Sequence, residues 1–299
     1  MTVRIGINPN TWTLDDIPEL KDFSTLDQCL LETKASHYSG IEMGGIFPRT
    51  ADGLKRALGK YDLDLISGWY AGHILEKSPE AEFDAVLPHL ATLREMGCAC
   101  VVYADCSGET FSDATVPLAG RPKLTSDEWK NYGRKITELA QMMAEFGVPM
   151  SFHHHIGTIV ESDEDVDALM ANTDAAVGLL LDTGHSSLAG GDPVRLAKRH
   201  ARRINHFHGK DVRIDVLQEA RRSNWSFVEA VLAGVYTVPG DGSTDYHAIL
   251  SALHDAGFSG WLVVEAEQDL RKAHPLTYAK LGFTNLSRLA IAAGFMTVS

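Results

Sequence analysis

The sequence predicts an α/β fold, a single (β/α)8 barrel spanning residues 1–299, and three observations support this prediction. Eight short apolar runs alternate with eight longer amphipathic runs, which is typical of repeated βα units around a parallel sheet. The length of 299 residues suits such a barrel, and no linker or change of composition divides the chain. The first apolar run ends in Asn8-Pro9-Asn10-Thr11-Trp12, without the glycine-rich turn that usually follows an early strand of an open doubly wound sheet.

The expected strands are the short apolar runs. In order, they cover residues 3–8, 40–45, 63–70, 99–105, 148–155, 177–185, 204–211 and 260–267. The expected helices carry apolar residues at helical spacing. They cover residues 25–38, 50–61, 80–97, 126–147, 161–173, 192–203, 244–257 and 275–294.

Local signals agree with these boundaries and indicate one insertion. Thr125 and Ser162 precede acidic first turns, where they can cap helices, and Gly147 follows a helical run as a left-handed cap does. The glycine, serine and aspartate content of residues 182–191 predicts a loop. Residues 211–240 are too many for one βα loop, so we expect an extra helix over residues 215–234, between the seventh and eighth strands.

Composition and charge exclude several classes of protein. The chain has 27 Lys and Arg against 40 Asp and Glu, a net charge of −13, which argues against binding to nucleic acid or to anionic membranes. No apolar run approaches the roughly 20 residues of a membrane span, and the first residues lack the pattern of a signal peptide. Four cysteines are too few for a chain of this length to depend on disulfides. A cytoplasmic location is therefore expected.

Polar residues gather at the ends of four successive expected strands. The fifth ends in His153-His154-His155, the sixth in Asp182-Thr183-Gly184-His185, the seventh in His206-Phe207-His208-Gly209-Lys210-Asp211, and the eighth in Glu265-Ala266-Glu267. In a parallel barrel these ends lie side by side on the face that carries the active site, about 5 Å apart. One imidazole or carboxylate from each strand could therefore meet a single ion.

The candidate ligands are His153, Asp182, His208 and Glu265. They are separated by 29, 26 and 57 residues, which corresponds to two single βα units and one unit that carries the insertion. Two imidazoles and two carboxylates suit a divalent transition metal better than calcium or magnesium. Strand alternation places His153 with His155, and His206 with His208, on a common face, so periodicity alone does not choose within either pair.

These residues carry a resemblance to a known family. The segments GINPNTW, GIEMGG, SFHHHIGT, LLLDTGH, HFHGKDVR, VPGDGSTDY and WLVVEAEQD run from residue 5 to 269 and resemble the xylose-isomerase-like TIM barrels. Within that superfamily they are most similar to the inosose dehydratases. The superfamily's metal ligands are Glu, Asp, His and Glu at the ends of strands five to eight. Matched position by position, they correspond to His153, Asp182, His208 and Glu265, and His153 departs from the usual glutamate.

The resemblance implies a lyase of inositol catabolism that removes water from 2-keto-myo-inositol. The cofactor would be a divalent metal, manganese or cobalt, which stabilises an enediolate. His185 is the first candidate for the base, because imidazole titrates near neutral pH, and a role in orienting a ligand is nearly as well supported. The remaining candidates are Glu267, His154 and Lys210 for acid catalysis, and Asn10, Trp12, Glu42 and Arg213 for contacts to the substrate.

Other readings remain open on the sequence alone. The main alternative is a divalent-metal sugar isomerase or epimerase of the same superfamily, whose product keeps the mass of its substrate. A DNA-repair endonuclease would need a basic groove, which the net charge disfavours. A catalytically silent sugar-binding protein is a further reading. The apolar stripe of residues 275–294 fits the eighth helix packing on the barrel, and its end also fits a contact within a homo-oligomer.

Overall fold

The strands form a closed parallel barrel, as predicted. The computed structural model describes residues 1–15 and 17–298, and eight strands of that part of the chain close into one sheet. They are β1 (Thr2–Ile7), β2 (Gly40–Met43), β3 (Asp64–Gly72), β4 (Val101–Asp105), β5 (Met150–His153), β6 (Gly178–Asp182), β7 (Ile204–Gly209) and β10 (Gly260–Val264). Pairing of β10 with β1, with Leu262 opposite Ile5, closes the barrel.

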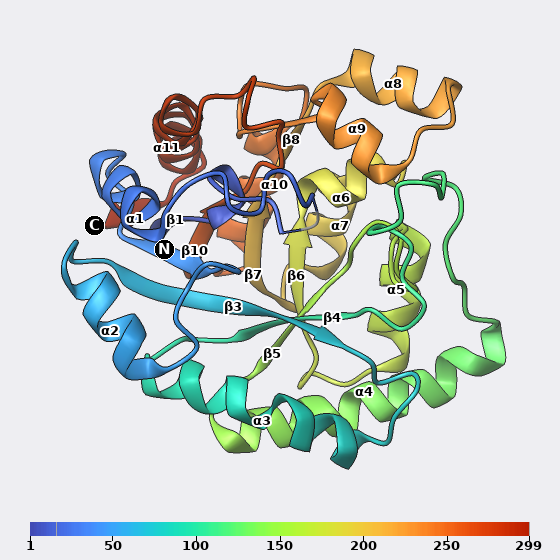
Figure 1. The fold of residues 1–299 in the computed structure, drawn as a ribbon. Coiled ribbons are helices and arrows are strands. Elements are labelled where there is room, and N and C mark those ends of the chain that lie inside the picture. Colours follow the sequence, from blue (N-terminus) through green and yellow to red (C-terminus); the bar gives the residue numbers. More distant parts are fainter. Residues whose placement is uncertain (16, 299) are drawn as a thin grey trace.

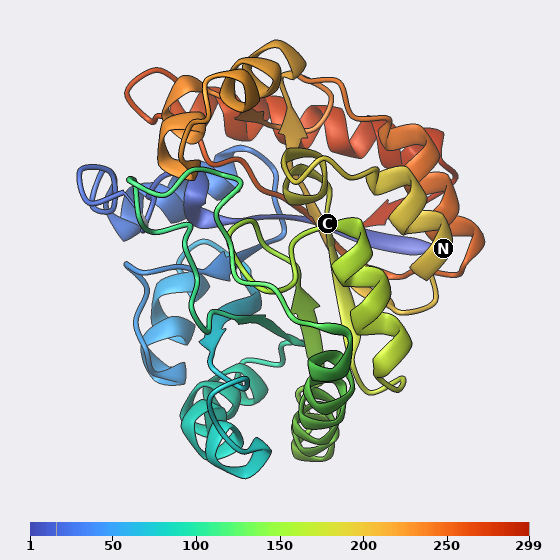
Figure 2. The same cartoon turned by 90° about the vertical axis from the view of Figure 1, so that its right-hand side faces the viewer.

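Helices surround the strands in both views (Figures 1 and 2). They are η1 (Pro9–Thr11), α1 (Leu26–Ala35), α2 (Ala51–Gly59), α3 (Pro79–Glu95), α4 (Ser126–Phe146), α5 (Asp163–Asn172), α6 (Thr183–Leu188), α7 (Pro193–His200), α8 (Ile214–Arg222), α9 (Phe227–Ala233), α10 (Tyr246–Asp255) and α11 (Pro275–Ala292). Leu90 of α3, Leu139 of α4 and Leu286 of α11 are fully buried in the layer between helices and sheet. Burial of one such side chain contributes about 1.5–3 kcal/mol.

The predicted helix caps form where the sequence places them. The side chain of Thr125 accepts a hydrogen bond from the backbone N–H of Glu128, and the carboxylate of Glu128 accepts one from the backbone N–H of Thr125. Both hydrogen bonds of this capping box are therefore formed. Ser162 and Asp165 make the same motif at the start of α5. At the end of α4, Gly147 takes a φ of 98°, a left-handed conformation that favours glycine.

The insertion between β7 and β10 contains two helices rather than one. The segment predicted as a single helix breaks after α8, where Asn224 has a φ of 54°, and α9 begins with Ser226 as its cap. Two short antiparallel strands, β8 (Asp211–Val212) and β9 (Tyr236–Thr237), close the base of the insertion. In Figure 1, α8 and α9 lie next to each other in orange.

A second difference concerns residues 182–191, which the sequence predicts as a loop. Six of them form α6, because Asp182 Oδ1 accepts hydrogen bonds of 2.8 Å from the backbone N–H groups of Gly184 and His185. The last residue of β6 is therefore also the cap of the helix that follows it.

Residues from the first and last strands of the described chain pair on the barrel. The strand β11 (Met296–Val298) pairs with the start of β1, and the Met296 N–H donates to the carbonyl oxygen of Met1 at 2.9 Å. Among residues 1–15 and 17–298, no helix is both long and apolar enough to cross a membrane.

Candidate metal centre

Four strand ends bring the predicted ligands together. His153 ends β5, Asp182 ends β6, His208 lies in β7, and Glu265 directly follows β10. Asp182 and His208 are register partners across the β6–β7 pair, so their side chains leave the sheet at the same height. All four side chains are buried, at 5% exposure or less.

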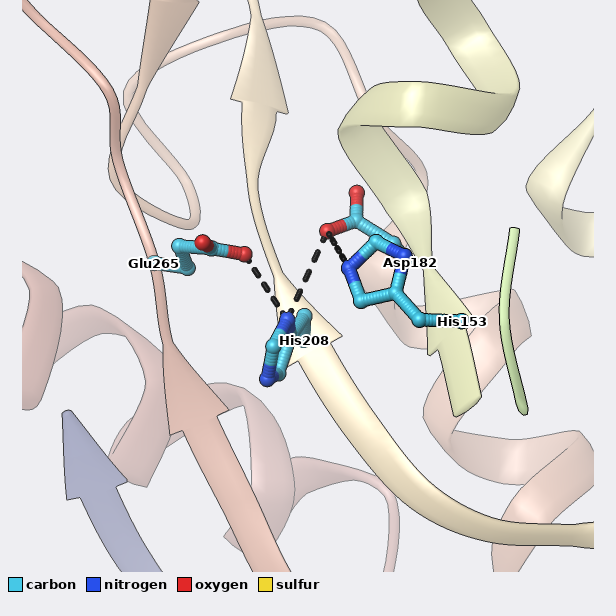
Figure 3. A group of neighbouring side chains, drawn as sticks. All are labelled: His153, Asp182, His208 and Glu265. Carbon is cyan, nitrogen blue, oxygen red and sulfur yellow. Dashed lines mark ion pairs between the residues drawn. The ribbon is translucent and has the colours of Figure 1, made fainter. Parts of the chain in front are cut away.

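The four side chains converge on one point (Figure 3). Their ligand atoms all lie within 4.8 Å of one another. Asp182 Oδ2 is 3.6 Å from both His153 Nε2 and His208 Nδ1, and His208 Nδ1 is 2.8 Å from Glu265 Oε2. Ligands about 2.1 Å from a tetrahedral zinc-like ion are about 3.4 Å apart. The two spacings of 3.6 Å match such an ion, and the His208–Glu265 pair at 2.8 Å would have to open by about 0.6 Å to admit it.

Unsatisfied polar atoms mark the same point. Within the described residues, Asp182 Oδ2, His208 Nδ1 and Glu265 Oε2 are buried and make no hydrogen bond of good geometry, and their close contacts are with one another and with Lys210 Nζ. Buried polar atoms without a well-formed hydrogen bond are uncommon in folded proteins. Three of them at one point, from three different strands, fit a divalent cation.

Hydrogen bonds orient both imidazoles toward the cluster. His153 Nδ1 lies 2.7 Å from the carbonyl oxygen of His154, which can only accept, so Nδ1 carries the hydrogen and Nε2 keeps its lone pair. His208 Nε2 donates to a carboxylate oxygen of Glu42 at 3.0 Å. Burial would lower the pKa of His208, but Glu42 and Glu265 outweigh it and raise this pKa well above its ordinary value, so without a metal Nδ1 carries a proton that faces Glu265 at 2.8 Å. A metal ion bound at Nδ1 would take the place of that proton.

Glu42 is at the centre of a second set of contacts. Its carboxylate accepts from Asn8 Nδ2 at 2.7 Å, Ser67 Oγ at 2.6 Å and His206 Nε2 at 2.8 Å, in addition to His208. Burial alone would raise the pKa of Glu42, but His208 and His206 outweigh this and hold the pKa below its ordinary value. An ionised Glu42 therefore fixes the ring of His208 from the side opposite to Asp182 and Glu265.

The electrostatics of the cluster depend on burial and close charges. Burial lowers the pKa of His153 well below its ordinary value, so this ring is neutral at neutral pH. Burial would raise the pKa of Glu265, but Lys210 and His208 outweigh it and hold this pKa well below the usual range. A neutral imidazole beside an ionised carboxylate is the state in which both bind a metal.

Lys210 and three further polar residues form a group beside the first. His155, His185 and Glu267 present ligand-type atoms within 4.8 Å of one another. The ammonium of Lys210 lies 2.9 Å from His185 Nε2 and 2.7 Å from Glu267 Oε2. All four side chains are buried.

A cavity of about 130 Å³ opens over the cluster. Of the predicted site residues, six are among the described residues that line it: Asn10, Glu42, His153, His208, Glu265 and Glu267. Asp182 lies beneath it, and His154 lies behind the strand ends, where its Nε2 accepts from the Asp182 N–H at 3.2 Å. The cavity wall also includes Trp69, Phe111 and His155.

Four further predicted residues do not line the cavity, and two of them, Trp12 and Arg213, have their contacts elsewhere. Trp12 is fully buried and donates from Nε1 to Glu32 at 2.7 Å. Arg213 binds carbonyl oxygens of Gly234 and Tyr236 and so ties the insertion to itself. Lys210 and His185 lie next to the ligand cluster, and neither is among the described residues of the cavity wall. The side chains of Trp12 and Arg213 therefore have partners within the protein and do not depend on contact with a substrate.

His155 lines the cavity, although nothing in the sequence favoured it over His153. Its Nδ1 lies 2.8 Å from the carbonyl oxygen of Ile156, which leaves the lone pair on Nε2. Its ring packs against Phe111 at 4.5 Å and His185 at 3.8 Å between centroids. The alternation of His153 and His155 on one face was the available signal. Phe111 comes from the long segment between β4 and α4, where no sequence pattern singled it out.

Comparisons with known proteins give a consistent result. A family model described as "Xylose isomerase-like TIM barrel" matches residues 32–286. The chain is 55% identical over 295 residues to the rhizopine catabolism protein MocC of Rhizobium meliloti, covering 99% of this chain and 91% of that protein. It is 39% identical over 279 residues to the inosose dehydratase of Geobacillus thermodenitrificans, covering 93% and 94% of the two chains.

Solved structures share the fold at low sequence identity. An L-ribulose 3-epimerase superposes with a TM-score of 0.69 at 15% identity, covering 98% of this chain and 96% of that one. The IOLI protein, whose structure contains a zinc atom, superposes with a TM-score of 0.67 at 18% identity, covering 97% and 98%.

Proposed function

The chain belongs to the xylose isomerase-like TIM barrel family, and from this premise we propose that it is a divalent-metal-dependent dehydratase of inosose. The reaction would remove water from 2-keto-myo-inositol, a cyclic polyhydroxy ketone. The observation that carries the proposal is the convergence of four ligand-type side chains, those of His153, Asp182, His208 and Glu265, at a cavity lined by further polar groups. The 39% identity to an inosose dehydratase over nearly the whole chain supports the choice of substrate.

The proposed ligands are His153, Asp182, His208 and Glu265. We propose manganese or cobalt as the ion, because two imidazoles and two carboxylates suit such metals. The zinc atom in the IOLI structure supports a metal in this type of barrel. When bound, the ion would polarise the ketone and neutralise the negative charge that develops on its oxygen.

Proton transfer is proposed for His155, with Glu267 beside it. Both line the cavity, and burial lowers the pKa of His155 to about 4, so its Nε2 is unprotonated at neutral pH. In the proposed reaction the C–H bond next to the ketone breaks and its proton passes to His155. The β C–O bond then breaks, and the protonated His155 returns the proton to the departing hydroxyl group, which leaves as water.

His185, the first candidate from the sequence, is proposed to support this base. Its Nε2 lies 2.9 Å from the ammonium of Lys210, which occupies the lone pair that a base would use. Its ring packs on that of His155 with a centroid distance of 3.8 Å. His185 therefore contacts the ring of His155, which lines the cavity, and does not line the cavity itself.

The test combines metal removal with a mass-resolved assay of the product. Purified protein stripped of metal should lose conversion of 2-keto-myo-inositol, and added manganese or cobalt should restore it. The product should be lighter than the substrate by one water. Full activity after complete metal removal would falsify the metal-dependent reaction, and a product of unchanged mass would favour the epimerase or isomerase alternative.

A role in rhizopine catabolism is the second candidate. It is favoured by the 55% identity to the rhizopine catabolism protein MocC, which exceeds the 39% identity to the dehydratase. The same cavity and ligands would serve it. Turnover of rhizopine and of 2-keto-myo-inositol, measured side by side on one preparation, separates the two candidates.

A further inference from the structure

A buried ammonium lies among atoms that otherwise resemble a metal-binding set. Lys210 Nζ is 2.7 Å from Glu267 Oε2, 2.9 Å from His185 Nε2, 3.2 Å from Glu265 Oε2 and 3.5 Å from Asp182 Oδ2. The side chain of Lys210 is fully buried. Four ligand-type atoms, from the ends of β6 and β10, thus surround one cationic nitrogen.

The residues around this nitrogen could bind a transition metal. His155, His185 and Glu267 offer two imidazoles and a carboxylate whose ligand atoms are within 4.8 Å of one another. The same composition, two histidines with carboxylates, makes up the proposed metal centre next to it. Imidazole and carboxylate donors together suit divalent first-row metals.

Two carboxylates are shared between the two groups. Asp182 Oδ2 and Glu265 Oε2 belong to the proposed metal centre, and both also contact Lys210 Nζ. In two-metal sites, the ions are about 3.5–4 Å apart, close enough for one carboxylate to interact with both. The ammonium of Lys210 therefore shares two carboxylates with the proposed metal centre, as the second ion of a two-metal site would.

The charge of the pocket explains why a cation is needed there. Asp182, Glu265 and Glu267 place three carboxylates around Lys210, all of them buried. The ammonium of Lys210 lies within 3.5 Å of an oxygen of each carboxylate and so balances part of their charge. A divalent ion entering the same space would meet a positive charge that cannot move into solvent.

We propose that the ammonium of Lys210 occupies a second cation position, so that the protein binds one divalent ion per chain although its side chains could hold two. Lys210 would thus determine the metal stoichiometry of the site. The inference rests on the proposed metal centre, because the first ion is the one held by His153, Asp182, His208 and Glu265.

The experiment counts metal ions per chain rather than turnover. Metal-free wild-type protein and Lys210→Met are equilibrated with Mn²⁺, freed of unbound metal and measured by elemental analysis. We expect one ion per chain for the wild type and two for Lys210→Met, because the substitution removes the competing charge at similar side-chain length. The electron paramagnetic resonance spectrum of Lys210→Met should also show coupling between two Mn²⁺ ions.

Matched variants identify the ligands of the second ion. Lys210→Met combined with Glu267→Gln should return to one ion, because it lacks a carboxylate of the second position. Lys77→Met removes a lysine that pairs with the buried Glu82 on α3, and it should keep the wild-type count of one. Two ions in the double variant would overturn the assignment of Glu267.

The outcomes distinguish this inference from the proposed function. No bound metal in the wild type contradicts the proposed metal centre itself. Two ions in the wild type, or one ion in a folded Lys210→Met, overturn the role of Lys210 and leave the metal centre in place. Should Lys210→Met fail to fold, titration of the wild type to millimolar Mn²⁺ still decides, since uptake of a second ion refutes the inference.

Discussion

Replacement of Glu42 by glutamine tests whether this carboxylate holds His208 in its metal-binding form. Glu42 accepts the Nε2 hydrogen of His208 at 3.0 Å, so Nδ1 is the nitrogen left to bind a metal. A glutamine amide offers N–H groups in place of one oxygen. Where its N–H faces Nε2, the ring is stabilised as the other tautomer, with a hydrogen on Nδ1, and that nitrogen cannot bind metal.

The expected loss of metal affinity follows from this one hydrogen bond. A hydrogen bond to a charged group contributes about 1.5–3 kcal/mol, and residues that orient metal-binding histidines typically change affinity 10- to 100-fold. We therefore expect Glu42→Gln to raise the Kd for Mn²⁺ about 10- to 100-fold, which corresponds to about 1.4–2.7 kcal/mol. Glu42→Asp, which keeps the charge, should lose less.

Competition with a chromophoric chelator measures this Kd without any turnover. Glu82→Gln is the matched control, because Glu82 is also a buried carboxylate and accepts a hydrogen bond from the backbone of His73, but it belongs to none of the described groups of ligand-type atoms. Its Kd should stay within twofold of the wild type, even where the fold is less stable. A Glu42→Gln protein that binds Mn²⁺ within threefold of the wild type would refute the reasoning.

Three further predictions follow from the same structure. His155→Gln should lower kcat by ~10²-fold or more while the Kd for Mn²⁺ changes less than threefold, and a larger loss of kcat in His185→Gln would return the role of base to His185. Mn²⁺ at 100 times its Kd should raise the free energy of unfolding by about 2.7 kcal/mol, and an unchanged urea midpoint would contradict a metal bound to the folded state. Burial raises the pKa of Glu161 from 4.5 to about 7, so between these values the folded state holds a proton that the unfolded state has released. The free energy of unfolding should therefore fall as the pH rises through this window, and Glu161→Gln should make this fall less steep. Glu164→Gln, at an exposed position, serves as the control. A Glu161→Gln protein whose stability falls with pH as steeply as that of the wild type would contradict the prediction.

The barrel could be predicted from the sequence because its signals are local. Each strand is a short apolar run, and caps such as Thr125 and Gly147 need only neighbours in the chain. The break between α8 and α9 was missed because it depends on Asn224 entering the left-handed region, which asparagine does only in some contexts. The helix α6 was missed because its residues are typical of loops and its cap, Asp182, belongs to the preceding strand.

The candidate site could be predicted at the level of strand ends, and less well within them. Strand alternation correctly placed His206 and His208 on one face. Only the structure distinguishes their roles, since His206 contacts Glu42 while His208 contacts both Glu42 and Asp182. That difference depends on height along the strand and on a carboxylate from β2, which lies more than 160 residues away in the chain. Trp12 and Arg213 illustrate the same limit, because their partners are fixed only by tertiary packing.

The pairing of β11 with β1 has a practical consequence for engineering. Because the two strands run parallel and Val298 lies beside Arg4, a peptide that joined Val298 to Met1 would run back past about three residues of β1, at about 3.3–3.6 Å each. New ends could then be opened in a surface turn between any helix and the next strand. Circular permutants of this kind would keep the metal ligands in place while changing the order in which the βα units leave the ribosome.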